Sequence, residues 1–169
     1  KYGLVLEYSL EENLILKKYY QKPFSNKGIL NYEEIEKYGE IIIKDFDVRA
    51  GQEGKTQVRS MSGGNQQKLV VGREIDSNPD LLIAVQPTRG LDVGAIEYIH
   101  KRLIEQRDSG KAVLMVSLEL DEVLGVSDRI AVINNGELIG IVDAKDTDEA
   151  EIGLMMTGIK RGEILENQN

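Results

Sequence analysis

The chain of 169 residues has no cysteine, a single histidine and no long apolar run. Without cysteine no disulfide can form, which fits a reducing compartment but does not establish one. A helix that crosses a membrane needs about 20 consecutive apolar residues, and no segment approaches this length. These absences exclude a disulfide-stabilised secreted fold and argue against a chain embedded in the bilayer.

An excess of positive charge is also absent. Asp and Glu number 29 against 21 Lys and Arg, which gives a formal net charge of −8. Nucleic acids and anionic lipid surfaces attract basic proteins, so neither is expected as the main partner. The hydrophobic fraction of 41% and the charged fraction of 30% are ordinary for a globular domain, and this length suffices to bury a core.

The motif that carries most information is the polar helix start Ser62-Gly63-Gly64-Asn65-Gln66. The first four N–H groups of a helix have no partner within the helix, and the helix dipole adds partial positive charge at that end. Glycines allow a phosphate to approach the backbone closely. The segment therefore predicts an anion-contacting helix N-terminus, although Ser62 could equally be a plain N-cap.

The next segment predicts a buried strand that is followed by a turn and a helix. The segment between Pro79 and Pro87 contains a short apolar run, residues 81–85, and predicts a strand at 80–85 of the kind found inside a parallel sheet. The turn Gly90-Leu91-Asp92 then leads into a helix near 93–108. Asp92 could serve only as the N-cap of this helix.

Hydrophobic spacing, capping residues and turn signals predict the remaining elements. We expect strands at 3–6 and 111–117, a hairpin of 130–133 and 137–142 around Asn135-Gly136, helices at about 9–20, 31–46, 62–76, 120 onward and 148–157, and loops at 22–29 and 47–61.

Residues 62–68 (SGGNQQK) and 86–95 (QPTRGLDVGA) together resemble one group of ABC ATPases. These are the ATPase subunits of bacterial simple-sugar and nucleoside importers, and the resemblance is to the second nucleotide-binding half over nearly the whole chain. It implies an α/β fold, a partial P-loop NTPase core with a mostly parallel sheet and a helical signature subdomain. The expected division is 1–78 for the helical subdomain, 79–158 for the partial core and 159–169 for a polar tail that frays.

An ATP-binding P-loop, G-x-x-x-x-G-K-[ST] between a strand and a helix, is missing. The nearest candidate, residues 51–56 (GQEGKT), fails because the first glycine would have to stand at Arg49 and because no helix is expected to begin at Lys55. We expect the P-loop and Q-loop upstream of Lys1, which would make this chain the C-terminal part of a longer protein. The fragment alone should bind ATP poorly and be inactive.

The resemblance also implies that the chain's own catalytic positions are degenerate. Val85 and Gln86 stand where the family has the magnesium-binding Asp and the catalytic Glu, and Leu118 stands at the switch histidine. Valine offers no oxygen to a hard cation, and an amide is no general base near neutral pH. His100, the only histidine, lies in the middle of a predicted helix and is interpreted as structural.

The motifs that act on a partner half are intact. In the family, two halves pair head-to-tail, and each ATP is held between one P-loop and the other half's signature. The residues that would contact the partner's nucleotide in trans are Ser62, Gly63, Gly64, Asn65, Gln66 and Asp92. Arg89 could contact phosphate or pair with a nearby carboxylate, and its role stays open.

The implied function is that of an energy-coupling subunit of an ABC importer for nucleosides or simple sugars, and the Val-Gln-Pro-Thr variant favours nucleosides. ATP and Mg²⁺ are expected in the full-length protein, with none bound to this fragment. Expected partners are the N-terminal half of the same polypeptide, permease subunits and, indirectly, a substrate-binding lipoprotein, at the cytoplasmic face of the membrane. Two alternatives remain: a non-transport ABC ATPase and a non-catalytic permease-docking module.

Overall fold

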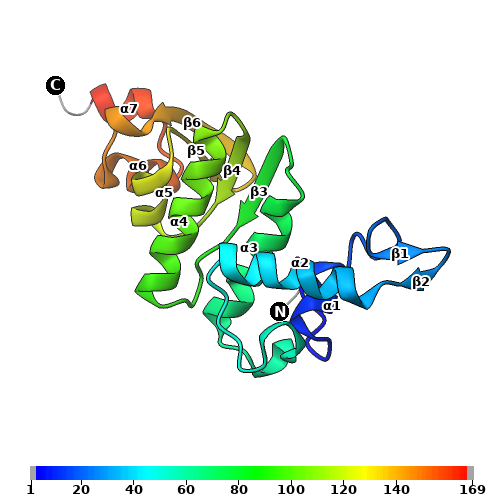
Figure 1. Cartoon of the computed structure of the whole chain (residues 1–169). Helices are drawn as coiled ribbons and strands as arrows, with labels where there is room; N and C mark the ends of the chain where they lie inside the picture. Colours follow the sequence, from blue (N-terminus) through cyan, green and yellow to red (C-terminus); the bar gives the residue numbers. More distant parts are fainter. Residues whose placement is uncertain (1–2, 167–169) are drawn as a thin grey trace. The chain divides into compact units, whose positions relative to one another are not determined.

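The computed structural model describes residues 3–166 as an α/β chain of helices and short strands (Figure 1). The described residues form two compact units. The first runs to residue 82 and includes 87–114, and the second combines 83–86 with the residues from 115 on. The division into a helical subdomain up to residue 78 and a partial core from residue 79 stays a prediction.

The first unit is mainly helical. Its helices are α1 (Leu10–Leu14), α2 (Tyr32–Asp45), α3 (Gly63–Asp76) and α4 (Val93–Asp108), with 3-10 turns at Glu53–Lys55 and Val58–Ser60. The predicted starts are confirmed by side-chain caps. Ser9 and Glu12 form a capping box at α1, while Asn31, Ser62 and Asp92 accept N–H bonds at α2, α3 and α4.

Apolar faces of these helices share one core. Its buried members are Leu10, Leu14, Ile42, Phe46, Val48, Val58, Met61, Leu69 and Ile75. Ile42 and Phe46 come from the helical repeat that the sequence predicts for α2. The core therefore fixes α3, the helix that begins at Gly63, against α1 and α2.

Two predictions in the N-terminal region are wrong. Residues 3–6 form no strand, because the side chain of Asn13 takes both backbone groups of Val5, accepting its N–H at 2.8 Å and donating to its C=O at 2.9 Å. The first helix ends at Leu14 instead of near residue 20, and turns follow it. In these turns Lys18 donates to Tyr38 and to Asp76 of α3, a tertiary contact that local helix signals do not contain.

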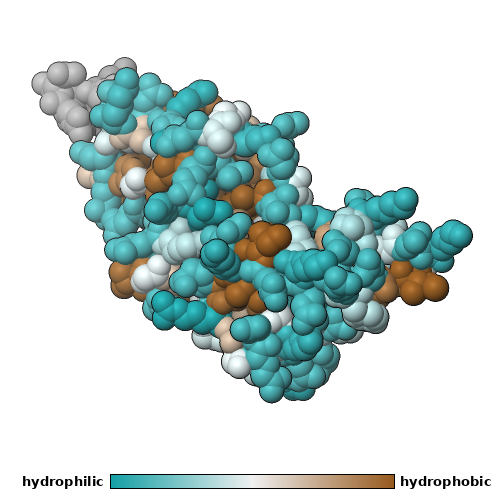
Figure 2. Space-filling model, viewed as in Figure 1, coloured by the Kyte–Doolittle hydropathy of each residue, from teal (hydrophilic) through white to brown (hydrophobic). Residues whose placement is uncertain are grey.

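The segment predicted as the loop 22–29 contains a small hairpin. Strands β1 (Ser25–Asn26) and β2 (Ile29–Leu30) pair antiparallel around Lys27 and Gly28, both at positive φ. Figure 2 shows a largely hydrophilic face with several apolar patches, one of them at this hairpin. Ile29 of β2 is 75% exposed.

Strands β3 (Leu81–Val85) and β4 (Ala112–Val116) confirm the positions of the two predicted strands, but the prediction that they are buried is wrong, because their residues alternate between exposed and half-buried. The N–H of Ala112 donates to Asp80 at one end, and the N–H of Gln86 donates to Val116 at the other. Both strands advance in the same direction between these bonds, so the pair is parallel. Such a pair needs a crossover, which the predicted helix α4 supplies.

The second unit contains α5 (Leu120–Val126), β5 (Arg129–Asn134), β6 (Glu137–Asp143), a 3-10 turn (Ala144–Asp146), α6 (Glu149–Met156) and α7 (Arg161–Glu166). The predicted hairpin is confirmed, with Asn135 and Gly136 at φ 48° and 82°. Ile130, Val132, Val142, Ile152 and Met155 form its core.

The expectation of a frayed polar tail from 159 on is wrong for α7. Arg161 donates to Glu151 at 2.7 Å and to the carbonyl oxygen of Asp146 at 2.8 Å, and these contacts tie the start of the helix to the preceding elements. Residues 167–169 lie outside the described part of the chain. Among the helices of the described residues, none is long and apolar enough to cross a bilayer.

Candidate functional site

The N-terminus of α3 presents hydrogen-bond donors to solvent. Ser62 caps the helix by accepting the Asn65 N–H, and the first intrahelical bond runs from the Gln66 N–H to the Ser62 carbonyl oxygen. The N–H groups of Gly63 and Gly64 precede that bond, and both Ser62 and Gly63 are exposed. A hydroxyl, two backbone N–H groups and the positive end of the helix dipole can bind an anion there.

The start of α4 packs directly against this N-terminus. Asp92 caps α4 by accepting the Ala95 N–H at 3.0 Å. A methyl group added at Gly64 would lie 3.2 Å from the Ala95 Cβ and 3.5 Å from an Asp92 carboxylate oxygen. The two predicted motifs, far apart in sequence, therefore meet in space, and Gly64 permits the close approach of the two helices.

The amide side chains of Asn65 and Gln66 are bonded within the chain. Asn65 accepts the Arg49 N–H at 2.8 Å and donates to the Ser62 hydroxyl oxygen at 3.0 Å. Gln66 donates to the carbonyl oxygens of Val58 and Met61 at 3.0 and 3.1 Å. These bonds hold the loop before α3 against the first turn of the helix, a role that spacing alone does not reveal.

Lys68, in the second turn of α3, links this helix to Asp47 and Tyr98, a contact that the sequence analysis did not predict. Its ammonium donates to the backbone oxygen and to a carboxylate oxygen of Asp47 at 3.0 and 2.8 Å, and it lies 4.6 Å from the centre of the Tyr98 ring. The hydrogen bond from Lys68 lowers the pKa of Asp47, and burial raises the pKa of Tyr98. The only signal in the sequence is the presence of Lys68 within the motif itself.

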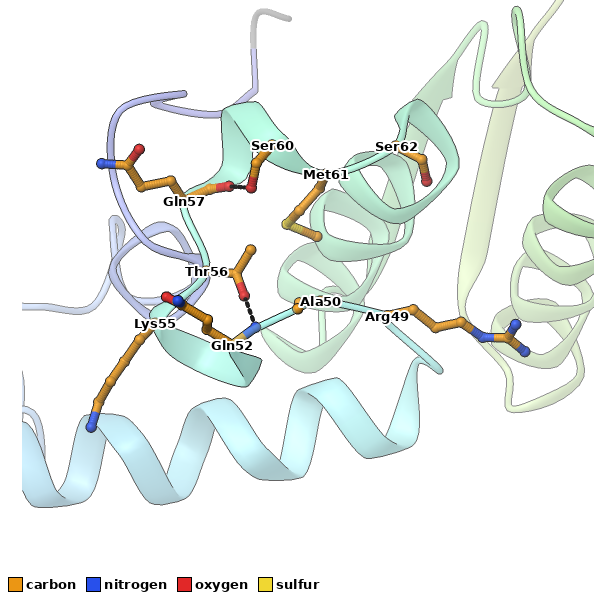
Figure 3. A pocket seen from close by; sticks show the side chains of 10 residues that line it. Arg49, Ala50, Gln52, Lys55, Thr56, Gln57, Ser60, Met61 and Ser62 are labelled. Atoms are coloured by element: carbon orange, nitrogen blue, oxygen red, sulfur yellow. Dashed lines mark hydrogen bonds between the residues drawn. The ribbon is translucent and has the colours of Figure 1, made fainter.

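A cavity of about 640 Å³ lies beside the loop that precedes α3 (Figure 3). Its lining is mostly polar: Arg49, Ala50, Gly51, Gln52, Lys55, Thr56, Gln57, Ser60, Met61 and Ser62. The Gly-Lys-Thr of residues 54–56 ends a 3-10 turn here, and no helix begins at Lys55, so the prediction that it is no P-loop is confirmed. Lys55 instead pairs with Glu36 of α2 at 2.9 Å.

The predicted degenerate positions gather in the second unit, at the carboxyl ends of β3 and β4. Gln86 follows β3 with φ at 49° and donates its N–H to Val116 at 2.8 Å. Val85 is 64% exposed and Leu118 is 74% exposed. Neither Val85 nor Leu118 carries a polar side-chain atom, so these residues do not fit a magnesium ion, which needs oxygen ligands. That Val85, Gln86 and Leu118 take no part in catalysis stays a prediction.

The structure assigns no role in the site to the two remaining residues that the sequence analysis named, His100 and Arg89. His100 lies in the middle of α4 and is half-buried, in agreement with the predicted position. Arg89 is exposed in the turn before Gly90, and its role stays open.

No family model matches the chain. Among curated proteins it is 56% identical over 158 residues to the guanosine import ATP-binding protein NupO of Bacillus subtilis, and 56% over 156 residues to the nucleoside import ATP-binding protein NupA of Lactococcus lactis. The chain is homologous to one part of the ABC-type import ATP-binding proteins. These matches cover 94% and 92% of the chain.

Sugar importers are represented at lower identity, with 40% over 156 residues to a ribose import ATP-binding protein of Bacillus cereus. The chain spans only 31% of the length of these three import ATP-binding proteins. Solved ABC structures share the fold of this chain. A dimeric bacterial ABC transporter cassette aligns with TM-score 0.68 at 24% identity over 86% of the chain and 60% of the cassette. A putative metal-chelate type ABC transporter aligns with TM-score 0.72 at 14% identity. The alignment covers 94% of this chain and 62% of the transporter chain.

Proposed function

We propose that this part of an import ATP-binding protein supplies the signature and D-loop that complete an ATP site on a partner nucleotide-binding half. One observation carries the proposal: Ser62 and Gly63 are exposed at the start of a helix whose next residue, Gly64, packs against Asp92. The Ser62 hydroxyl and the N–H groups of Gly63 and Gly64 would donate to the γ-phosphate of ATP held by the partner. Asp92 would hold the start of α4 against them.

The opposite role, hydrolysis at this chain's own catalytic strand, is not supported by the residues present. Val85 and Leu118 offer no ligand to a metal or a phosphate, and the Gln86 amide has no useful proton affinity near neutral pH. The full-length protein would therefore use ATP and Mg²⁺ at one competent site, to which this chain contributes only donors in trans.

The cargo we propose is a nucleoside. The two relatives at 56% identity are a guanosine and a nucleoside import protein, whereas the glucose and ribose import proteins stand at 38–41%. Uptake of labelled nucleosides and of labelled ribose by cells that carry or lack the natural gene tests the assignment. Loss of ribose uptake with intact nucleoside uptake would contradict it.

The proposed assembly places this chain at the cytoplasmic face of the membrane. Its partners would be the N-terminal nucleotide-binding half of the same polypeptide and the permease, whose cytoplasmic loops would contact the helical subdomain, with a substrate-binding lipoprotein acting through the permease. Affinity purification of the natural full-length protein tests this proposal. Recovery of permease subunits supports it, and recovery of nucleic acid or ribosomes instead points to a non-transport ABC ATPase.

The trans role is tested by Ser62→Arg in the full-length protein. The large cation would fill the space that the phosphate needs, so ATP turnover and uptake should be abolished. Ser77→Arg is the matched control, because Ser77 is an exposed serine at the C-terminal end of the same helix. Wild-type turnover in Ser62→Arg would refute the proposed function, whatever the control shows.

A further inference from the structure

The orientation of the Asn65 side chain is determined by its neighbours. The backbone N–H of Arg49 is purely a donor and lies 2.8 Å from the amide, so the amide oxygen has to face it. The amide nitrogen then faces the hydroxyl oxygen of Ser62 at 3.0 Å and donates to it. An amide nitrogen has no acceptor capacity, so the Ser62 hydroxyl cannot donate in return.

The hydroxyl oxygen of Ser62 receives a second donor, the backbone N–H of Asn65, at 3.4 Å. A hydroxyl has two acceptor lone pairs and one proton, and these two N–H groups occupy the acceptor side. Within residues 3–166 the Ser62 proton has no acceptor at bonding distance. The residue is exposed, so the proton is available for donation to solvent or to a group that lies in front of the helix start.

We propose that Asn65 is a positioning residue that keeps the Ser62 hydroxyl a hydrogen-bond donor toward the γ-phosphate, and that its own side chain does not touch the nucleotide. The inference rests on the proposed trans function and refines the sequence expectation that Asn65 contacts the nucleotide directly. A donor that is oriented before the phosphate arrives needs no reorganisation during the reaction, which is the most effective form of electrostatic stabilisation.

A double-mutant cycle in the full-length protein, reconstituted with its permease, tests the inference. Ser62→Ala should lower ATP turnover by about 10- to 100-fold, the value of a hydrogen bond to a charged group. Asn65→Ala should lower it by about 2- to 10-fold, because the hydroxyl is then free to rotate. In the Ser62→Ala background, Asn65→Ala should cause no further loss, since the group through which it acts is already gone.

Asn65→Asp provides a second, isosteric variant that keeps the Arg49 bond. Its second carboxylate oxygen is an acceptor and would draw the Ser62 proton inward, so turnover should fall close to the level of Ser62→Ala. Added to Ser62→Ala, the same substitution should again cost nothing more. Repulsion between the new charge and the phosphate would instead lower turnover in both backgrounds, and that result would overturn the inference.

The outcomes separate the two proposals. If Asn65→Ala reduces turnover equally with and without the Ser62 hydroxyl, Asn65 only supports the loop through Arg49; the positioning role is then overturned and the trans function stands. If Ser62→Ala itself has no effect, the proposed function is overturned. Thermal unfolding of each variant shows whether a loss of turnover reflects loss of fold, and the cycle is read only from variants that unfold at the wild-type temperature.

Discussion

Gln86 combines an unusual backbone conformation with a side chain that we propose to be catalytically inactive. Its φ of 49° lies in the left-handed region, which disfavours residues with a Cβ by about 1–2 kcal/mol. The conformation turns the chain sharply after β3, where its N–H bonds to Val116. The backbone thus forms a tight turn at the strand end, while the side chain is an amide without a basic function.

Replacing Gln86 should therefore have little effect on catalysis in the full-length protein. We expect Gln86→Ala to change steady-state ATP turnover by less than about twofold. The Gln86 amide does not accept a proton near neutral pH, so the substitution removes no catalytic base. Gln86→Glu should not create a second working site, since Val85 still offers no oxygen to a metal.

The control for this prediction is the corresponding glutamate of the upstream half, whose removal should stop hydrolysis. Steady-state phosphate release by the three variants decides the assignment. A large loss of turnover in Gln86→Ala, with unchanged thermal unfolding, would mean that this half performs chemistry that we assign to its partner.

At the scale of elements, the position of α3 depends on close packing at a glycine. A methyl group added at Gly72 of α3 would lie 2.9 Å from the Phe46 ring and 3.2 Å from Ile42 of α2. Real Cβ atoms do not approach a ring this closely, so α2 and α3 would have to separate. The glycine therefore sets the spacing between the two helices.

Gly72→Ala should lower the free energy of unfolding by about 1–3 kcal/mol, the usual cost of overpacking a core. Gly153→Ala is the matched control, because Gly153 lies within α6 and an added methyl meets no atom within 4 Å. There the better helix propensity of Ala should add about 0.5–1 kcal/mol. Urea unfolding of both variants measures the difference, and equal effects of the two substitutions would refute the packing argument.

A second element-scale contact joins the N-terminal segment to the C-terminal half of α3. Arg73 is 5% exposed and donates to the backbone oxygens of Gly3 and Asn13, while Lys17 and Arg73 both bond to Glu74. Burial alone would raise the pKa of Glu74, but these hydrogen bonds outweigh it and leave the pKa below its ordinary value.

The lowered pKa of Glu74 predicts a pH dependence of stability. A carboxylate with a depressed folded-state pKa stabilises the fold above its unfolded pKa, near 4.3, and this contribution disappears as the pH falls through the lower folded pKa. Glu74→Gln should therefore be less stable than the wild type at pH 7, with a difference that shrinks below about pH 4.

Urea unfolding of Glu74→Gln and wild type between pH 7 and pH 3 tests this dependence. Glu97→Gln, an exposed position on α4, is the control and should show little change at any pH. A destabilisation by Glu74→Gln that is the same at pH 3 as at pH 7 would show that the contact is not ionic.

At the scale of the whole molecule, the chain holds one part of the chemistry that an ABC ATPase requires. We propose that residues 62–66 and Asp92 act as signature and D-loop, while the Gly-Lys-Thr at 54–56 ends a 3-10 turn and does not form a phosphate cradle. We therefore expect the purified chain of 169 residues to release no phosphate from ATP above background.

A phosphate-release assay on the purified chain measures this activity directly, with Gln86→Ala as the control for contamination. A slow rate that is unchanged in Gln86→Ala would come from a contaminating ATPase. A rate that Gln86→Ala abolishes would contradict the prediction and place catalysis in this chain.

The sequence by itself determined the features that depend on neighbouring residues. Ser62 and Asp92 were recognisable as helix caps, because a capping bond spans only three residues, and Asn135-Gly136 specified its turn for the same reason. The motif residues were recognisable as a set because their chemistry depends on the order of residue types within a few positions.

Only the tertiary structure decided what depends on distant residues. The bonds of Asn13 to the Val5 backbone replace the strand that the sequence predicts there. Helix α1 ends earlier than predicted, and the turns that follow it contain the contact of Lys18 with Asp76. Asn65 acquired its orientation from Arg49, sixteen positions earlier in the chain. Such bonds compete with local preferences of a few tenths of a kcal/mol per residue, so packing between segments decides the outcome, and no local pattern records it.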